Sequence, residues 1–168
     1  AIEMALASFE NRDDFHYIGH DLFEDGNEEL SAKELNAKKI VSIEAITKHL
    51  NEFKGKMKER NKTFTFELIK GDTNQTLEND IDADLAYIDG GHSTVTVQND
   101  YGKLKHIPVL VFDDFFTADK DGNCVEPEFQ EVNRIMEQTT HRKYVLPSSD
   151  GVREGGFTHL AVMLTDPD

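Results

Sequence analysis

The sequence predicts an α/β protein with a mostly parallel sheet flanked by helices and an antiparallel pair of strands at its C-terminal end. Short apolar segments alternate with segments whose apolar residues recur at helical spacing, which is typical of parallel strands joined by crossover helices. The last two apolar segments are separated by roughly nine residues, fewer than the dozen or so that a crossover helix needs. We therefore expect residues 143–149 to run antiparallel to residues 158–165.

The first two elements are predicted to be an amphipathic helix and a strand. In "AIEMALASFE", the residues Ile2, Leu6 and Phe9 recur on one helical face. No Ser, Thr, Asp or Asn precedes this helix to cap its first turn, so we expect the native helix to begin upstream and the chain to be trimmed at its N-terminus. The apolar run "FHYIGHDLF" is predicted to be a strand that ends at Asp21.

A second helix and a second strand follow a polar connection over residues 24–42. Apolar residues at helical spacing in "SIEAITKHLNEFKGKMKE" predict a helix that is capped by Ser42. The segment "TFTFELIKGD" alternates between apolar and polar residues and then reaches Gly71 and Asp72. This pattern predicts a strand with a turn at its end.

The C-terminal half continues the same alternation. The segments "DLAYIDGG" and "PVLVFDDFF" are predicted strands, and the second is apolar up to Asp113, as expected for a strand buried on both faces. Residues 94–105 and the segment "EPEFQEVNRIMEQ" are predicted helices. Because the sequence has no internal repeat and no proline-rich linker, we expect residues 1–168 to form a single domain.

The composition argues against several classes of protein. The 168 residues are 38% hydrophobic and 30% charged, which is typical of a globular protein in water. The net charge of −15 would repel phosphate backbones, so we expect no nucleic-acid partner. No apolar run approaches the ~20 residues of a membrane span. The single cysteine, Cys124, cannot form an internal disulfide, which favours a cytoplasmic protein.

Acidic residues stand where each of four predicted strands ends. In open α/β sheets, ligands bind at the carboxyl ends of the strands. Aspartate also caps helices and begins turns, so each of these acids by itself has an ordinary structural explanation. Four such strand ends together favour a ligand site. The residues are Asp21; Gly71, Asp72 and Thr73; Asp89, Gly90, Gly91 and His92; and Asp113 with Asp114.

Three of these acids are candidates for a metal site. Asp89 and the pair Asp113 and Asp114 follow strands that we expect to be neighbours, and close carboxylates repel one another unless a cation lies between them. Oxygen ligands suit Mg²⁺, Mn²⁺ or Ca²⁺ better than zinc. Gly90 and the glycine after it permit positive φ and let a ligand approach the backbone closely. We expect His92 to titrate near neutral pH.

The same residues resemble a known family. The motif "YIDGGHS", followed later by "DDF", is similar to class I S-adenosylmethionine-dependent methyltransferases, and most of all to their metal-dependent O-methyltransferase branch. The resemblance covers nearly the whole chain. It implies a Rossmann-like sheet with an antiparallel C-terminal hairpin. It also implies methyl transfer from S-adenosylmethionine to a hydroxyl of a small molecule or sugar, assisted by Mg²⁺ or another divalent cation.

The resemblance further implies where the cofactor would bind. The acid after one strand would hold the ribose hydroxyls, and the residues after the next strand would flank the adenine. The family's first strand and glycine-rich loop, which receive the methionine half, should precede Ala1 and are absent from this sequence, so we expect weakened cofactor binding. The implied cofactor residues are Asp21, Gly71, Asp72, Thr73, Asp89 and Gly90.

The implied reaction centre combines the metal ligands with a base. By resemblance, Asp89, Asp113 and Asp114 would bind the divalent ion, which lowers the pKa of an acceptor hydroxyl and orients it. His92 is a candidate general base next to Asp89. The expected partner is a small-molecule acceptor, with no nucleic acid or membrane, and a homo-oligomer is compatible with the sequence.

Other functions stay open when the residues are considered alone. A metal-dependent hydrolase could use the same carboxylates with an activated water, but it would leave Asp21 and the turn at Gly71 without a role. A binding protein that kept the fold and lost the methyl donor is a further alternative. The segment "TADKDGNCVEPE" has an EF-hand-like spacing from Thr117 to Glu128, but a predicted strand precedes it where an EF-hand needs a helix, so we expect a polar turn.

Overall fold

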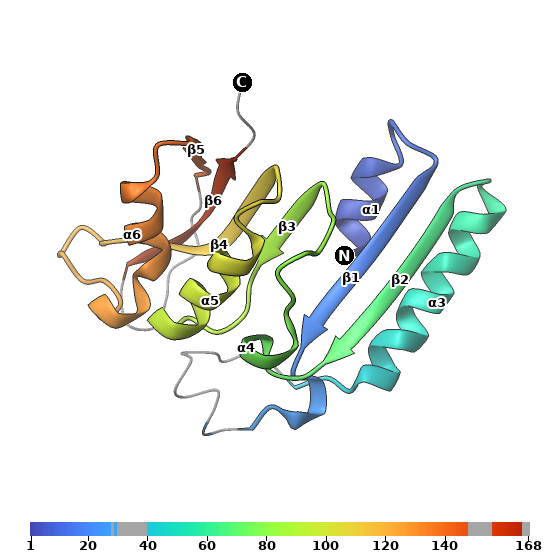
Figure 1. Cartoon of the computed structure of the whole chain (residues 1–168), viewed down its shortest axis with the longest axis horizontal. Helices are drawn as coiled ribbons and strands as arrows, with labels where there is room; N and C mark the ends of the chain where they lie inside the picture. Colours follow the sequence, from blue (N-terminus) through green and yellow to red (C-terminus); the bar gives the residue numbers. More distant parts are fainter. Residues whose placement is uncertain (28, 30–39, 148–155, 166–168) are drawn as a thin grey trace. The chain divides into compact units, whose positions relative to one another are not determined.

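The computed structural model describes residues 1–27, 29, 40–147 and 156–165 (Figure 1). They belong to two compact units, one built mainly from the chain up to Thr76 and the other mainly from Leu77 onward. Each unit contains one sheet, and the chain is an α/β protein with one parallel and one mixed sheet. The predicted mostly parallel sheet is therefore divided between two sheets in the described residues, with β1 and β3 in different ones.

The sheet of the first unit is a parallel pair of equal strands. β1 (Asp14–Asp21) and β2 (Thr63–Lys70) are in register along their whole length, so that Asp21 lies opposite Lys70. The next backbone N–H, that of Gly71, donates a hydrogen bond to the carbonyl of Asp21 at 2.9 Å. Because the two strands end together, Asp21 and Gly71 begin their loops at the same edge of the sheet.

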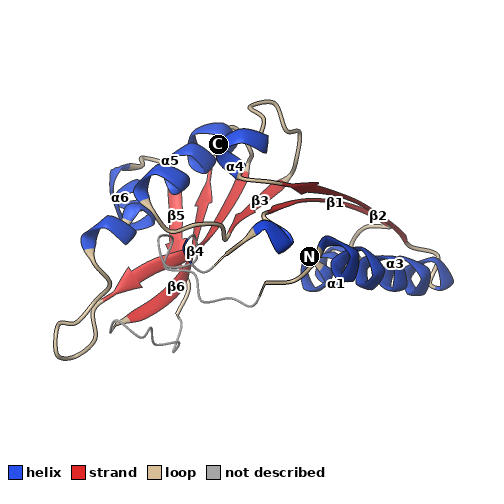
Figure 2. Ribbon diagram, turned by 90° about the horizontal axis from the view of Figure 1, so that it is seen from below, coloured by secondary structure: helices blue, strands red, loops and turns tan. Residues whose placement is uncertain are grey.

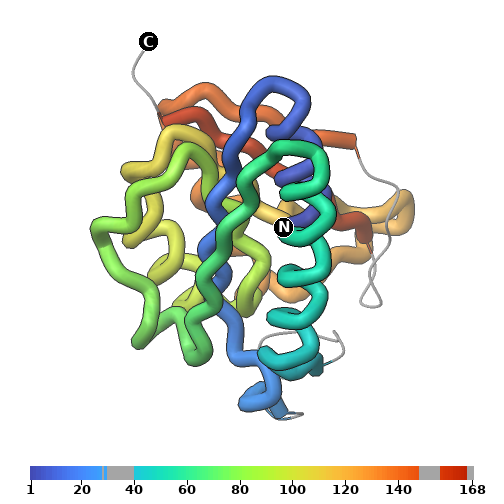
Figure 3. The backbone as a smooth tube through the Cα atoms, turned by 90° about the vertical axis from the view of Figure 1, so that its right-hand side faces the viewer, coloured from blue at the N-terminus to red at the C-terminus, as the bar shows by residue number. Residues whose placement is uncertain are grey.

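Two helices cover one face of this sheet. α1 (Ile2–Ser8) and α3 (Ile43–Glu59) share a core with β2, and Figure 3 shows α3 running beside that strand. α1 buries Ala5, whereas Leu6 is 41% exposed. The predicted apolar face is therefore wrong at Leu6, which lies about 100° around the helix from Ala5. The buried core of the unit consists of Ala5, Phe9, Leu50, Phe53, Met57 and Phe64.

The start of α3 is fixed by hydrogen bonds to two side chains. Ser42 caps the helix as predicted, and its Oγ accepts a hydrogen bond at 3.3 Å from the N–H three residues further on. Glu24, in the short 3₁₀ helix η1 (Phe23–Asp25), accepts a hydrogen bond from the N–H of Ile43 at 2.9 Å and forms an ion pair with Lys70. Glu24 thereby connects the ends of three elements. Residues 28 and 30–39 of the predicted connection lie outside the described part.

The sheet of the second unit is mixed. Its order is β3-β4-β6-β5, with β3 parallel to β4 and the remaining neighbours antiparallel. β5 pairs antiparallel with β6 from Arg142 opposite Leu164 to Val145 opposite Ala161, as expected for the last two strands, while residues 148–155 of their connection lie outside the described part. The strands are β3 (Leu85–Ile88), β4 (Val109–Thr117), β5 (Arg142–Val145) and β6 (Phe157–Leu164).

Helices α5 (Thr94–Leu104) and α6 (Glu131–Gln138) lie on one face of this second sheet (Figure 2). Alternate residues of β4, including Leu110 and Phe112, are fully buried against them, while the residues between are only partly buried. The prediction that β4 is buried on both faces is therefore wrong for this unit, because its described helices cover one face. The predicted helix around Glu131 begins as a separate 3₁₀ turn, η2 (Pro127–Phe129).

The polar segment after β4 is a turn without an EF-hand. A strand leads into it, as expected, and not a helix. Oδ1 of Asp119 accepts hydrogen bonds from the backbone N–H groups of Asp121 and Asn123 at 2.8 and 2.9 Å. Hydrogen bonds from Asn123 hold the pKa of Asp119 below its ordinary value. The carboxylate therefore closes its own turn.

The long helix α3 is polar on its outer face. α3, with 17 residues, carries lysines and glutamates along its exposed side, including Lys54 and Glu52. Within the described residues, none of the helices combines the length with the apolar character that crossing a bilayer requires.

Candidate metal centre

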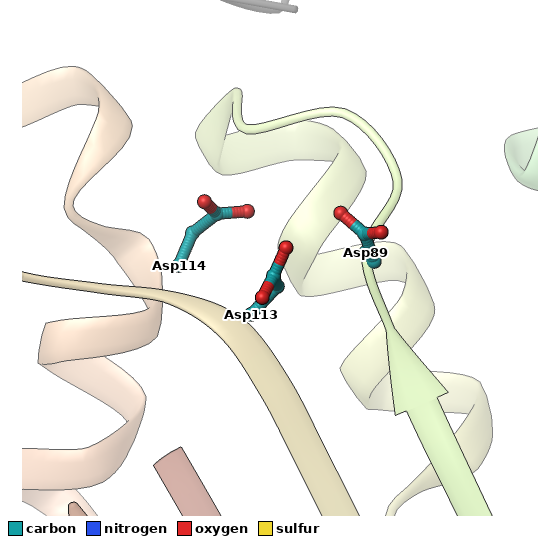
Figure 4. Close-up of side chains that lie close together, drawn as sticks. All are labelled: Asp89, Asp113 and Asp114. Atoms are coloured by element: carbon teal, nitrogen blue, oxygen red, sulfur yellow. The ribbon is translucent and has the colours of Figure 1, made fainter. Parts of the chain in front are cut away.

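β3 and β4 bring acidic residues together where their parallel ladder ends. The last hydrogen-bonded pair joins Ile88 to Phe112. Asp89 follows β3 directly, and Asp113 follows Phe112 on β4. Because parallel strands present their carboxyl ends at the same edge, the two aspartates lie side by side, with Asp114 on the other side of Asp113 (Figure 4).

The sequence predicted that this strand ends at Asp113, but β4 extends beyond that residue. It continues to Thr117 because β6 supplies hydrogen-bond partners beyond the point where β3 ends. The pairing with β6 is irregular between Phe112 and Phe115. In a regular strand, Asp113 and Asp114 would point to opposite faces, and irregularities of this kind redirect side chains. The irregularity spans these two residues, and both contribute to one acidic cluster.

The three carboxylates lie close enough to approach one hard divalent cation. One oxygen from each of Asp89, Asp113 and Asp114 lies within 4.8 Å of the other two, and all three residues are half-buried. Two ligands of one ion can be no farther apart than twice the metal–oxygen distance. This limit is ~5 Å for Ca²⁺, which the 4.8 Å bound meets, and ~4.2 Å for Mg²⁺, which requires the oxygens to lie closer together than that bound. The predicted proximity of the three acids is therefore confirmed, and metal binding itself stays a prediction.

Tyr87 contacts this cluster and was missed from the sequence. Its hydroxyl donates a hydrogen bond of 2.9 Å to Oδ1 of Asp113. Partial burial, this hydrogen bond and the charges of the three carboxylates raise the pKa of Tyr87 above its ordinary value. Strand alternation could have identified Tyr87, because it stands two residues before Asp89 and so lies on the same face of β3.

His92 faces the cluster from the loop after β3. Its Nε2 lies 3.0 Å from Oδ2 of Asp114, close enough for an ion pair when the ring is protonated, although the approach lacks the angle of a hydrogen bond. Both ring nitrogens are shielded from solvent and make no hydrogen bond with the described part of the chain. Buried polar atoms in proteins are nearly always hydrogen-bonded, so a shielded imidazole of this kind suggests that a bound group completes the site.

The loop between Asp89 and His92 is held close to α5. Neither glycine of this loop uses the positive φ that a glycine permits. Ser93 caps α5 and anchors the end of the loop. A Cβ built at Gly90 would lie 3.4 Å from Oδ2 of Asp100, a carboxylate on α5 that is only 5% exposed. A side chain at Gly90 would therefore make an ordinary contact with Asp100, a buried acid to which sequence reasoning had assigned no role.

Two further predicted strand ends lie in the first unit, and the first of them is at Asp21. Oδ1 of Asp21 accepts a hydrogen bond of 2.6 Å from the N–H of Phe23, so this acid stabilises the turn into η1. Phe23 has a φ of 49°, which is uncommon for a bulky residue.

Gly71, Asp72 and Thr73 form a tight turn at the same edge of the first unit. Gly71 has a φ of 141°, a conformation that other residues rarely adopt. Oδ1 of Asp72 accepts a hydrogen bond of 2.9 Å from the N–H of Asn74, and Thr73 is the first residue of the short helix α4 (Thr73–Thr76). These contacts are structural, and they place all three residues next to Asp21.

The structure thus groups the predicted site residues into two sets, one in each unit. Asp89, Asp113, Asp114 and His92 form the acidic cluster of the second unit. The residues around Asp21 gather at one edge of the first unit. When the chain is compared with family models, curated proteins and solved structures, no match is found.

Proposed function

We propose that this chain is an S-adenosylmethionine-dependent methyltransferase that transfers a methyl group to a hydroxyl of a small-molecule acceptor with the help of a divalent cation. The observation that carries the proposal is the meeting of Asp89, Asp113 and Asp114 where β3 and β4 stop pairing. A cluster of three half-buried carboxylates is electrostatically unfavourable without a cation, which supports a binding role over a purely structural one.

In this proposal the three aspartates bind Mg²⁺ or a similar ion. A bound Mg²⁺ lowers the pKa of the acceptor hydroxyl and makes it a better nucleophile. His92 accepts the hydroxyl proton, and its contact with Asp114 stabilises the imidazolium that results. Tyr87 and the loop at Gly90 hold the carboxylates in place, so that the acceptor is oriented when it arrives.

The proposed nucleoside contacts lie at the strand ends of the first unit. Asp21 would accept a hydrogen bond from a ribose hydroxyl, as the resemblance implies. The turn at Gly71 would lie against the adenine, and the resemblance also assigns cofactor contacts to Asp89 and Gly90. The proposed residues of the adenine contact are Gly71, Asp72 and Thr73. We place this activity in the cytoplasm, on a Rossmann-like fold.

The experiment that tests the function is a calorimetric titration of S-adenosylhomocysteine into the protein with and without Mg²⁺. We expect weak but saturable binding by the wild type and by Asp113→Asn, because the contacts to the methionine half are absent and Asp113 belongs to the metal site and not to the nucleoside site. Absence of binding by the wild type, combined with metal-dependent phosphoesterase turnover, would instead identify the hydrolase. Absence of both binding and turnover would favour the non-catalytic alternative.

A further inference from the structure

The hydrogen bond between Tyr87 and Asp113 links two neighbouring strands within the acidic cluster. Tyr87 lies on β3, opposite Val111 of β4, and its hydroxyl reaches Oδ1 of Asp113 at 2.9 Å. Because side chains alternate along a strand, Tyr87 and Asp89 lie on the same face, where both adjoin Asp113. The tyrosine hydroxyl is therefore a neutral donor next to three carboxylates.

We propose that Tyr87 is a positioning residue that limits Asp113 to coordination through a single oxygen and so makes the site prefer small six-coordinate cations to Ca²⁺. This inference rests on the proposed metal site. It adds Tyr87, which is not itself a metal ligand, and it predicts which cations the site prefers.

The physical reason is competition for the oxygens of Asp113. The Tyr87 hydroxyl occupies one lone pair of Oδ1 and fixes the rotation of the carboxylate, so that Oδ1 becomes a weaker metal ligand than Oδ2 and coordination through Oδ2 alone is favoured. Ca²⁺ takes six to eight oxygen ligands and often binds carboxylates through both oxygens, whereas Mg²⁺ takes six and keeps several waters. A carboxylate held by a hydroxyl therefore penalises Ca²⁺ more than Mg²⁺ or Mn²⁺.

The contact of Asp114 with His92 acts in the same direction. Oδ2 of Asp114 faces Nε2 of His92 at 3.0 Å. A cation that used both oxygens of Asp114 would have to share one of them with the imidazole. Two of the three carboxylates thus have a neighbour on one oxygen, which favours coordination through one oxygen by each.

The test is a comparison of Mn²⁺ and Ca²⁺ affinities, measured by calorimetry, in the wild type and in Tyr87→Phe. The variant keeps the aromatic ring and removes only the hydroxyl. Tyr144→Phe is the matched control, because Tyr144 is 52% exposed on β5, at the opposite edge of the same sheet. Melting temperatures of all three proteins, measured without metal, check that the fold is kept.

We expect Tyr87→Phe to bind Ca²⁺ more tightly relative to Mn²⁺, with the ratio of the two dissociation constants shifted roughly tenfold, as for the loss of one hydrogen bond to a charged group. Tyr144→Phe should keep the wild-type ratio. An unchanged ratio in Tyr87→Phe, or an equal shift in both variants, would overturn the role of Tyr87 while leaving the metal site intact. Absence of binding of either ion to the wild type would overturn the metal site and this inference with it.

Discussion

Nε2 of His92 and Oδ2 of Asp114 lie 3.0 Å apart, with only 12% and 17% of the two side chains exposed. A carboxylate at this distance can form an ion pair with an imidazole that has accepted a proton. In the proposed reaction, His92 accepts the proton of the acceptor hydroxyl while Asp114 lies next to it.

Replacing His92 with glutamine tests this role. We expect kcat for methyl transfer to fall by roughly 10²–10⁴-fold, as for the loss of a general base, while the Mn²⁺ dissociation constant stays within a few-fold of the wild-type value. His141→Gln, at an exposed position before β5, is the control and should be unaffected. A parallel loss of Mn²⁺ affinity in His92→Gln would show that the imidazole positions the metal instead.

Replacing Asp113 with asparagine should not destabilise the protein when metal is absent. The change removes one of three neighbouring negative charges, and asparagine still offers an oxygen to the Tyr87 hydroxyl. We expect the free energy of unfolding in the presence of EDTA to stay the same or to rise by about 0.2–1 kcal/mol. A clear decrease in melting temperature would mean that Asp113 stabilises the fold through contacts that outweigh the repulsion.

Gly71 should be intolerant of a side chain. Its φ of 141° is rarely adopted by other residues, and an added Cβ would lie 2.7 Å from Cγ2 of Thr76. We expect Gly71→Ala to lower the free energy of unfolding by about 1–3 kcal/mol in urea titrations. Gly55→Ala is the control, and it should raise the free energy of unfolding instead. Gly55 lies within α3, and no atom lies within 4 Å of the added Cβ. That variant should gain about 0.5–1 kcal/mol.

Glu24 should make stability depend on pH in the acidic range. A hydrogen bond from Lys70, aided by the N–H of Ile43, lowers the pKa of Glu24 from 4.5 to about 2. Because the folded-state pKa is the lower one, the stabilisation is fully present above pH 4.5 and is lost as the pH falls toward 2. The difference in melting temperature between wild type and Glu24→Gln should shrink over that range.

The control for this pH dependence is Glu52→Gln, at an exposed position of α3. Its melting temperature should follow that of the wild type at every pH. A difference between wild type and Glu24→Gln that is constant from pH 6 to pH 2 would show that the charge of Glu24 contributes nothing to stability.

The sequence predicted the order of the elements because local patterns determine it. Alternation in "TFTFELIK" and helical spacing after Ser42 depend on nearby residues, and both elements are present. The proximity of Asp89 and Asp113 was predicted for a similar reason, since the ends of adjacent parallel strands must meet. Which strands pair within each sheet was harder to predict, because no local sequence pattern specifies the partner of β1 or β3.

The errors within the site come from contacts between distant segments. β4 extends past Asp113 because β6, more than forty residues later, continues the pairing. Asp21 and Asp72 both cap turns through backbone N–H groups, a role that residue type allows and only geometry establishes. Tyr87 was missed because an uncharged aromatic residue is common in strands and does not by itself indicate a site, although its position two residues before Asp89 fixes its face.

A calorimetric titration of Mn²⁺ into wild type, Asp113→Asn and Asp82→Asn tests the metal centre most directly. Asp82 is an exposed acid outside the cluster, and its variant controls for the change in net charge. We expect one ion to bind per chain in the wild type and in Asp82→Asn, with affinity reduced at least about tenfold in Asp113→Asn, as for the loss of one charged ligand. Equal Mn²⁺ affinity in all three proteins would contradict a metal site at Asp89, Asp113 and Asp114.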